Sequence, residues 1–135
     1  AKIVSTLRNN MIPIVCLGER ERDARVEHML TEQAQRTFDG VMPSDIERCL
    51  IAYEPVWAIS SQPGAQPDNP QSAATSVGFI QNAIGDKALC LYGGSVNAEN
   101  VEGFLLQKPF HGVLVGGASV KKDSFQSILD VVARI

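Results

Sequence analysis

Residues 49–58 read CLIAYEPVWA and contain the most informative pattern in the chain. The first five are apolar at nearly every position, which is typical of a strand covered on both faces in a parallel sheet. Glu54 follows directly, and Pro55 then stiffens the turn because its ring restricts φ. The stretch therefore predicts a buried strand that ends in a carboxylate, immediately before a rigid turn.

Three further apolar runs have the same character and read IPIVCL at 12–17, ALCLY at 88–92 and GVLV at 112–115. Apolar residues three and four positions apart predict a helix after each run. These residues are Val26, Met29, Leu30 and Ala34; Val77, Ile80 and Ile84; Val101, Phe104 and Leu105; and Phe125, Ile128, Leu129, Val132 and Ile135. Four strand–helix units in this order predict a single α/β domain over residues 1–135, with parallel strands and right-handed crossovers.

Helix ends are marked by capping residues. Asn69 before Pro70 is typical of an N-cap with proline in the first turn, and Asn97 can cap the helix that carries Val101. Ser44 to Glu47 has capping-box spacing and predicts a brief helical turn. Residues 3–7 are expected to form the end of a helix whose beginning is missing.

Composition excludes several classes of protein. Of the 135 residues 44% are hydrophobic, and the net charge is −3 with Lys and Arg scattered, so we expect no nucleic-acid partner. No apolar run approaches the ~18 residues of a membrane span, and no secretory signal is visible. Cys16, Cys49 and Cys90 lack metal-ligand spacing and are expected to be buried, reduced thiols. The sequence thus favours a cytoplasmic protein with no metal and no cofactor.

Position relative to the strand ends selects the candidate site, because parallel α/β folds bind ligands at the C-terminal ends of their strands. Glu54, residues 93–95 and residues 116–119 lie there. His111 opens the last run and His28 lies within a predicted helix, so both are excluded. Glu19 also follows a strand, and we interpret it as a polar support or a salt-bridge partner of Arg20 or Arg22, in preference to a catalytic group. The charged run of residues 19–23 is interpreted as a solvated helix entry.

Glu54 and two glycine turns are the chemical candidates. Trp57 and Val56 flank Glu54, and partial desolvation of a carboxylate raises its pKa and makes it a better base near neutral pH. Glycine lets backbone N–H groups approach an anion, most favourably at the start of a helix. Gly116 and Gly117 are therefore candidate phosphate ligands, with Ser95 on the neighbouring loop. Tight turns without a ligand are the alternative.

The segments 53–59, 92–96 and 113–119, in this order and spacing, resemble the C-terminal half of triosephosphate isomerase. The resemblance runs from about residue 12 to residue 135. It implies four parallel strand–helix units that form half of a (β/α)8 barrel. It also implies an aldose–ketose isomerase of glycolysis and gluconeogenesis, which interconverts glyceraldehyde 3-phosphate and dihydroxyacetone phosphate.

By this resemblance Glu54 is the base that moves a proton between the two carbons, and Pro55, Val56 and Trp57 form the N-terminal hinge of a lid. Ser95, Gly116 and Gly117 would bind the substrate phosphate through backbone N–H groups. Tyr92 would help to hold the closed lid.

The lid sequence departs from the family pattern. The family usually continues Ala-Ile with Gly-Thr-Gly-Lys, whereas here Ala58-Ile59 is followed by SSQPG at 60–64, in a loop about three residues longer. Ser60 replaces a glycine whose N–H meets the phosphate, and Pro63 removes a donor. An isomerase of another small sugar phosphate, such as a tetrulose phosphate, is the alternative that this departure favours.

The N-terminal half of the family pattern, with its Asn-x-Lys segment and electrophilic His, is absent. We therefore expect the chain to be nearly inactive alone, and to be a fragment rather than a self-contained protein. An N-terminal half-barrel or a second copy of the chain, as in a homo-oligomer, would close the barrel; an open, covered sheet is the third possibility. A non-catalytic half-barrel that binds anions or assembles as a structural module is the alternative of another class.

Overall fold

The computed structural model describes residues 2–59, 64–66 and 68–135. Its strands are β1 Ile14–Leu17, β2 Leu50–Tyr53, β3 Leu89–Tyr92 and β4 Phe110–Val113. Its α-helices are α1 Lys2–Arg8, α2 Val26–Thr37, α3 Pro43–Ile46, α4 Pro70–Ile84, α5 Val101–Leu105 and α6 Lys122–Val132. Short 3₁₀ turns, η1 Val56–Ala58 and η2 Gly117–Val120, follow β2 and β4.

The four strands form one parallel sheet in the order β1-β2-β3-β4. This confirms the predicted fold class of four parallel strand–helix units. The first three strands lie within their predicted ranges, but the last was predicted at 112–115 and lies two residues earlier. Phe110 pairs with Cys90 and Gly112 with Leu91, so the register shifts at this point. His111 therefore lies within the strand, and its Nδ1 accepts a hydrogen bond from the Cys90 N–H at 3.2 Å.

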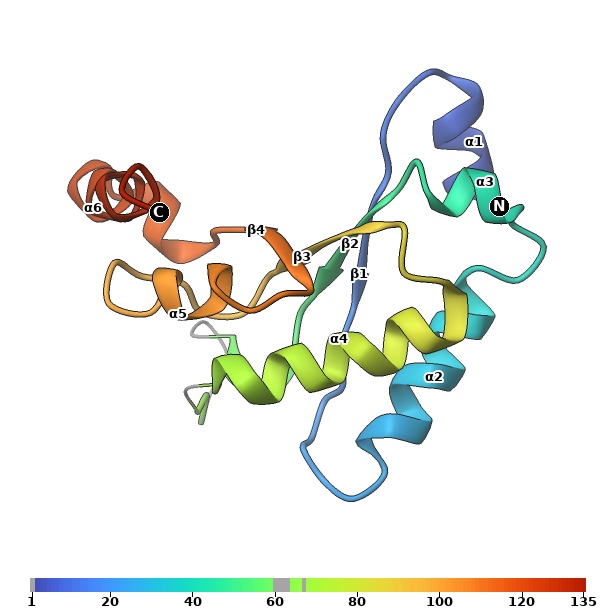
Figure 1. Cartoon of the computed structure of the whole chain (residues 1–135), viewed down its shortest axis with the longest axis horizontal. Coiled ribbons are helices and arrows are strands. Elements are labelled where there is room, and N and C mark those ends of the chain that lie inside the picture. The colour runs from blue at the N-terminus through green and yellow to red at the C-terminus, as the bar shows by residue number, and fades with distance from the viewer. Residues whose placement is uncertain (1, 60–63, 67) are drawn as a thin grey trace.

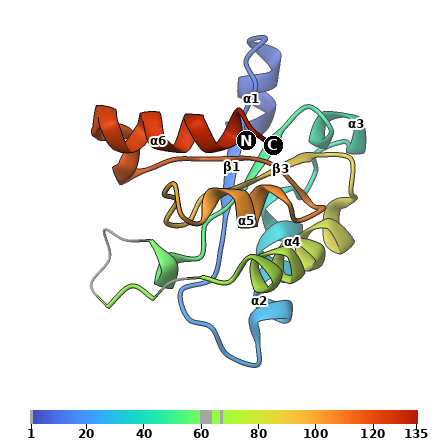
Figure 2. The same cartoon turned by 60° about the vertical axis from the view of Figure 1, so that its left-hand side comes forward.

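Helices α2, α4 and α5 lie along one side of the sheet, and α2 and α4 run side by side (Figures 1 and 2). Every second side chain of each strand points toward these helices, and these side chains form the core. They include Ile51, Tyr53, Cys90, Tyr92 and Phe110 from the strands and Leu30, Val77, Ile80, Val101 and Phe104 from the helices. The Tyr92 ring stacks on that of Phe104 with centroids 3.6 Å apart. Apolar burial on this face therefore holds the strand ends in register.

The opposite face of the sheet is open among the described residues. Ile14 is 50% exposed and Leu89 is 46% exposed, although they pair with Leu50 on the same row. The expectation that the strands are covered on both faces is met for β2, where Ile51, Ala52 and Tyr53 are all buried, but not for β1 and β3. The stripe predicted for the last helix behaves similarly, because Ile128 is buried while Leu129, Val132 and Ile135 are exposed. The exposed apolar side chains of the sheet and of α6 are therefore not covered by the other described elements of the chain.

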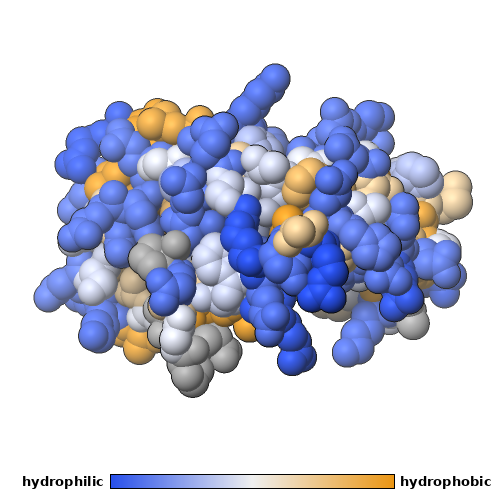
Figure 3. Space-filling model, turned by 90° about the horizontal axis from the view of Figure 1, so that it is seen from below, coloured by the Kyte–Doolittle hydropathy of each residue, from blue (hydrophilic) through white to orange (hydrophobic). Residues whose placement is uncertain are grey.

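The outer surface is more polar. Figure 3 views the molecule from below Figure 1, the side on which α2 and α4 lie, and this face is mostly hydrophilic with small, separated apolar patches. Such scattered patches are ordinary for a protein surface.

Helix capping follows the sequence in part. The Asn69 side chain accepts hydrogen bonds from the N–H groups of Gln71 and Ser72, as an N-cap should. Asn97 accepts from Glu99 and Asn100 and forms a turn ahead of α5, which begins only at Val101. The brief helical turn predicted at Ser44 to Glu47 is confirmed as α3, but Ser44 does not cap it, because α3 begins at Pro43 and its N-cap, Met42, makes no side-chain hydrogen bond.

Candidate active site

Glu54 lies at the C-terminal end of β2, beside the turn that follows β3. The Gly93 N–H donates to the Tyr53 carbonyl at 2.8 Å, so the two strand ends remain paired as the chain leaves the sheet. A Cβ at Gly93 would come within 2.5 Å of Glu54 Cγ and 3.3 Å of its Oε1. The Glu54 side chain therefore lies directly against the Gly93 backbone, and glycine is required there to make room for it.

Gly18 makes room for the Glu54 backbone, as Gly93 makes room for the Glu54 side chain. A Cβ at this position would overlap the Glu54 carbonyl oxygen. Gly18 is also held by Gln33 of α2, whose Oε1 accepts its N–H at 2.9 Å. The sequence analysis missed Gly18, because a single glycine after a strand does not reveal which backbone approaches it.

Cys16 is the side chain of β1 that interacts with Glu54. Partial desolvation, and then the Glu54 carboxylate through hydrogen bonding and charge, raise the pKa of the Cys16 thiol to about 11, although Cys16 remains solvent-accessible. The expectation of three buried thiols is thus wrong for Cys16, which is exposed, and confirmed for Cys49 and Cys90. Cys16 points to the open face of the sheet, because it lies two residues from Ile14 on the same strand.

The residues after Glu54 form a compact turn. Pro55 is fully buried, and Val56–Ala58 make one turn of 3₁₀ helix. The Val56 N–H donates to the Glu19 carbonyl at 2.9 Å. The indole Nε1–H of Trp57 donates to Glu19 Oε1 at 2.9 Å, and the Tyr53 hydroxyl donates to the same oxygen at 2.9 Å. Glu19 is 4% exposed, and these contacts agree with the supporting role predicted for it.

Arg22 connects the same turn to α4. Its guanidinium lies 5.4 Å from the centroid of the Trp57 ring, and Nη1 is 3.7 Å from Glu19 Oε1. Its Nη2 donates to the Ser72 carbonyl at 3.4 Å. The interpretation of residues 19–23 as a solvated helix entry is therefore wrong for Glu19 and Arg22, whose side chains pack around Trp57.

Ser95 makes contact with the end of the same turn. Its N–H donates to the Ala58 carbonyl at 3.2 Å, and its hydroxyl donates to the same oxygen at 2.7 Å. The turn after β3 is thereby tied to the turn after β2. An anion that takes the Ser95 N–H has to compete with the Ala58 carbonyl.

Gly116 and Gly117 follow β4 at the same edge of the sheet. Both are exposed, and a Cβ added to either would meet no heavy atom within 4 Å. Packing within the described residues therefore does not require glycine here, in contrast to Gly18 and Gly93. The Ser119 N–H and hydroxyl both donate to the Gly116 carbonyl, which shapes the 3₁₀ turn that begins at Gly117.

Tyr92 is buried beneath this edge, and burial raises the pKa of its hydroxyl well above the usual range. A Cβ at Gly94 would overlap that hydroxyl oxygen. Asp68, which sequence reasoning did not single out, faces the same hydroxyl. Burial raises the pKa of Asp68 to about 6, against the opposing effects of the Asn69 N–H, Arg22 and Tyr92. Ser60, predicted as part of the lid, lies outside the described residues.

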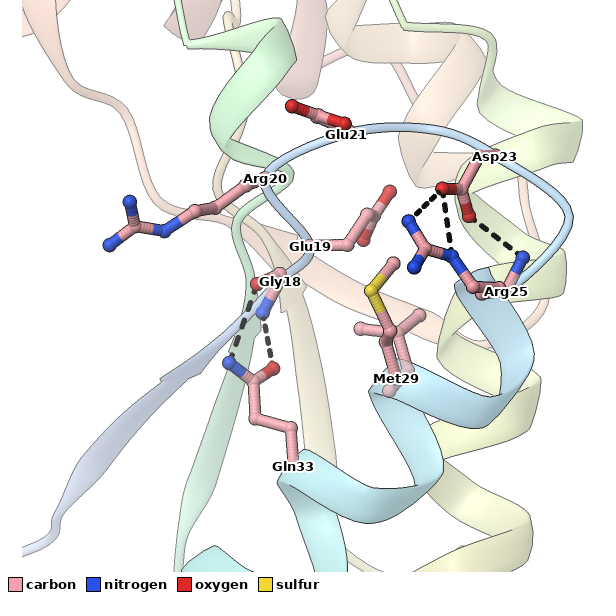
Figure 4. Close-up of a pocket in the computed structure, with 9 residues that line it drawn as sticks. Gly18, Glu19, Arg20, Glu21, Asp23, Arg25, Met29 and Gln33 are labelled. Atoms are coloured by element: carbon pink, nitrogen blue, oxygen red, sulfur yellow. Dashed lines mark hydrogen bonds and ion pairs between the residues drawn. The ribbon is translucent and has the colours of Figure 1, made fainter.

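A pocket of about 340 Å³ opens beside the C-terminal end of β1 (Figure 4). Gly18, Glu19, Met29, Leu30 and Gln33 line it, together with the charged residues Arg20, Glu21, Asp23 and Arg25. The Arg25 guanidinium pairs with the Asp23 carboxylate at 2.6 Å.

In the part of the chain that the structure describes, no group of three or more His, Cys, Asp or Glu side chains is placed to hold a metal ion. None of the described helices is long and apolar enough to cross a membrane.

The fold and this edge define a (β/α)4 half-barrel that has a carboxylate and two glycine turns at the C-terminal ends of its strands. The family model for triosephosphate isomerase matches residues 1–132. The chain belongs to the triosephosphate isomerase family.

Curated relatives of this chain are named triosephosphate isomerase. The triosephosphate isomerase of Dictyoglomus turgidum is 38% identical over 136 residues, which cover 95% of this chain and 55% of the relative. That of Mesomycoplasma hyorhinis is 37% identical over 129 residues, covering 96% of this chain and 52% of the relative. The triosephosphate isomerase of Roseiflexus sp. is 37% identical over 136 residues, which cover 95% of this chain and 54% of the relative. The chain spans about half the length of the curated relatives it matches.

Proposed function

We propose that the protein is an aldose–ketose isomerase that interconverts glyceraldehyde 3-phosphate and dihydroxyacetone phosphate, with Glu54 as the base. The observation that supports this most strongly is the position of Glu54. Its side chain lies against Gly93 at the edge of the sheet where two further glycines follow β4. Family membership agrees with the same activity.

The proton transfer needs only one carboxylate. Glu54 takes a proton from the carbon beside the carbonyl, the electrons of that C–H bond form the C=C double bond of an enediolate, and the carbonyl π electrons move onto the carbonyl oxygen. The protonated Glu54 returns the proton to the neighbouring carbon, and the hydroxyl proton passes from one substrate oxygen to the other, so that the carbonyl moves by one position. Cys16 contacts Glu54 as a thiol, because its pKa of about 11 keeps it protonated near neutral pH. It therefore adds no second negative charge beside the base.

The substrate phosphate is proposed to lie on the backbone N–H groups of Ser95, Gly116 and Gly117. The lack of any heavy atom near a Cβ at Gly116 or Gly117 supports this, since an anion can approach their backbone closely. The two hydrogen bonds from Ser95 to Ala58 support a link between the phosphate turn and the proposed hinge at Pro55, Val56 and Trp57. Tyr92 is proposed to help hold the lid closed.

A complement is proposed for the open face of the sheet. Enediolate chemistry needs donors aimed at the carbonyl oxygen, and one missing donor of this kind typically costs about 10²–10³ in rate. The four described strand–helix units supply the proposed base, and we propose that the donors come from outside them. An N-terminal half-barrel, or a second copy of the chain in a homo-oligomer, would supply the donors and cover Ile14 and Leu89. The proposed location is the cytoplasm.

A second candidate is an isomerase of a larger sugar phosphate, such as a tetrulose phosphate. The sequence SSQPG at 60–64 supports it, because it replaces the usual lid of the family. Asp68, which is half-buried with its Oδ2 shielded from solvent, adds a carboxylate close to the proposed lid.

Turnover by the full-length protein on three- and four-carbon sugar phosphates tests both candidates. The first predicts a higher kcat/KM on the three-carbon substrates, and a preference for the four-carbon ketose phosphate would favour the second. A Gly117→Val variant should raise KM at least tenfold without loss of folding, since Gly117 is exposed and a Cβ there meets no heavy atom within 4 Å. Gly78→Val, on the partly exposed side of α4, is a control for the substitution itself. No turnover on any of these substrates would leave a non-catalytic half-barrel.

A further inference from the structure

The segment that follows β1 runs alongside the backbone that carries the proposed base. The Glu54 N–H donates to the Leu17 carbonyl at 2.7 Å, and the Val56 N–H donates to the Glu19 carbonyl at 2.9 Å. Gly18 stands between these two acceptors, and a Cβ on it would overlap the Glu54 carbonyl oxygen. This segment therefore supports the backbone of Glu54 and of the turn that follows it.

The polar backbone groups of Gly18 itself point away from β2, because successive residues of a strand direct their N–H and C=O groups to alternate sides. On that side β1 is the edge of the sheet, so no further described strand meets them. Gln33 of α2 takes the place of such a strand (Figure 4). Its Oε1 accepts the Gly18 N–H at 2.9 Å, and its Nε2 donates to the Gly18 carbonyl at 3.4 Å. One side-chain amide thus binds both backbone groups of Gly18.

Gln33 is anchored by the helix that carries it. Leu30 and Ala34 of α2 are fully buried in the core, and α2 packs along α4. Gln33 itself is exposed, so it adds little apolar burial of its own. Its contribution therefore lies in the position that it gives to Gly18.

We propose that Gln33 is a positioning residue for Glu54, because it holds the Gly18 backbone against the Glu54 carbonyl and so fixes the strand end that carries the base. The inference rests on the proposed function, since it concerns the base of that reaction. Misplacement of a reacting group by about 1 Å can lower a rate by about 10²-fold. Partial release of Gly18 should therefore lower kcat by about tenfold, and KM should stay within about threefold because Gln33 contacts neither of the proposed phosphate turns.

The test compares Gln33→Met, which keeps the length of the side chain but removes its donor and acceptor, with Gln35→Met. Gln35 is exposed on the same helix, two residues further on and therefore on the opposite face. Amide hydrogen exchange of the full-length protein is followed by NMR at Gly18, Glu54 and Val56. Gln33→Met should speed exchange at all three by at least about fivefold, since loss of the hydrogen bonds at Gly18 makes local opening easier.

The same strand pair supplies an internal control. The Leu50 N–H donates to the Pro13 carbonyl at 2.9 Å at the opposite end of β1 and β2, and its exchange should not change in Gln33→Met. Gln35→Met should match the wild type in exchange, in kcat and in KM. Steady-state turnover of glyceraldehyde 3-phosphate by the full-length variants gives kcat and KM separately.

Faster exchange at Gly18 with Glu54 unchanged would overturn the inference, because the effect of Gln33 would then end at Gly18. A wild-type kcat in Gln33→Met would overturn it as well, and so would a KM that rises while kcat stays constant. Hydrogen exchange does not depend on turnover. An inactive wild-type protein would therefore count against the proposed function, while exchange at Glu54 would still decide whether Gln33 holds this residue in place.

Discussion

Replacing Glu19 with alanine should destabilise the protein by about 2–4 kcal/mol. Glu19 Oε1 accepts from the Tyr53 hydroxyl, which is fully buried, and from the Trp57 indole N–H, which is partly buried. Each donor left without a partner costs about 1–3 kcal/mol, with the lower value for Trp57 because water can reach it. Removing the unpartnered Oε2 offsets part of this cost.

Glu19→Gln is the matched control. Its amide oxygen can still accept from both donors, and it loses only the ion pair with Arg22, which at 3.7 Å and with Arg22 part-exposed contributes about 1 kcal/mol or less. Urea unfolding of the full-length protein, followed by circular dichroism, measures the free energy of unfolding for each variant. If alanine and glutamine destabilise equally, or if alanine costs less than about 1 kcal/mol, then the shared acceptor is not what holds Trp57 and Tyr53 in place.

Asp68→Asn should stabilise the protein by about 1–2 kcal/mol at pH 8 but not at pH 4. The folded state holds the Asp68 proton up to about pH 6 and the unfolded state only to about 3.8, so wild-type stability falls as pH rises across this window. Thermal unfolding at both pH values measures this, and an equal effect at both would contradict it. Asn69→Ala should cost about 1 kcal/mol through loss of the cap on α4, seen as a lower urea midpoint. Phe104→Ala should cost about 3–5 kcal/mol by the same assay, since its ring is buried against Tyr92; a cost under 1 kcal/mol would refute the packing.

The strands and the edge that carries the site were predictable from the sequence. Runs such as 49–53 are short, apolar and followed by turn residues, and parallel strands place their C-terminal ends together. Glu54, Gly93 and Gly116 therefore fall at one edge for topological reasons alone. The position of β4 was less certain from sequence, because a register shift beside Leu91 moves the strand by two residues.

The contacts around Glu54 were not predictable. The approach of the Glu54 carbonyl to Gly18 and the interaction of Cys16 with the carboxylate depend on how β1 and β2 pair, and one sequence does not reveal that register. Asp68 was hidden for a different reason. It stands in a stretch of polar residues and prolines, where a half-buried carboxylate has no sequence pattern of its own.

The open face of the sheet was only partly anticipated. Apolar residues at Ile14 and Leu89 indicate strands that are covered on both faces, but they do not indicate which polypeptide covers them. The comparison with relatives about twice as long supports a complement of similar size, as proposed above.

The kcat of a Glu54→Gln variant in the full-length protein tests the central proposal most directly. Glutamine keeps the shape that fits against Gly93 but cannot accept the proton. Loss of a general base of this kind lowers the rate by about 10²–10⁴, so we expect kcat on glyceraldehyde 3-phosphate to fall by at least 10² while KM changes less than about threefold. An unchanged kcat would show that another group takes the proton and that the position of Glu54 has been misinterpreted.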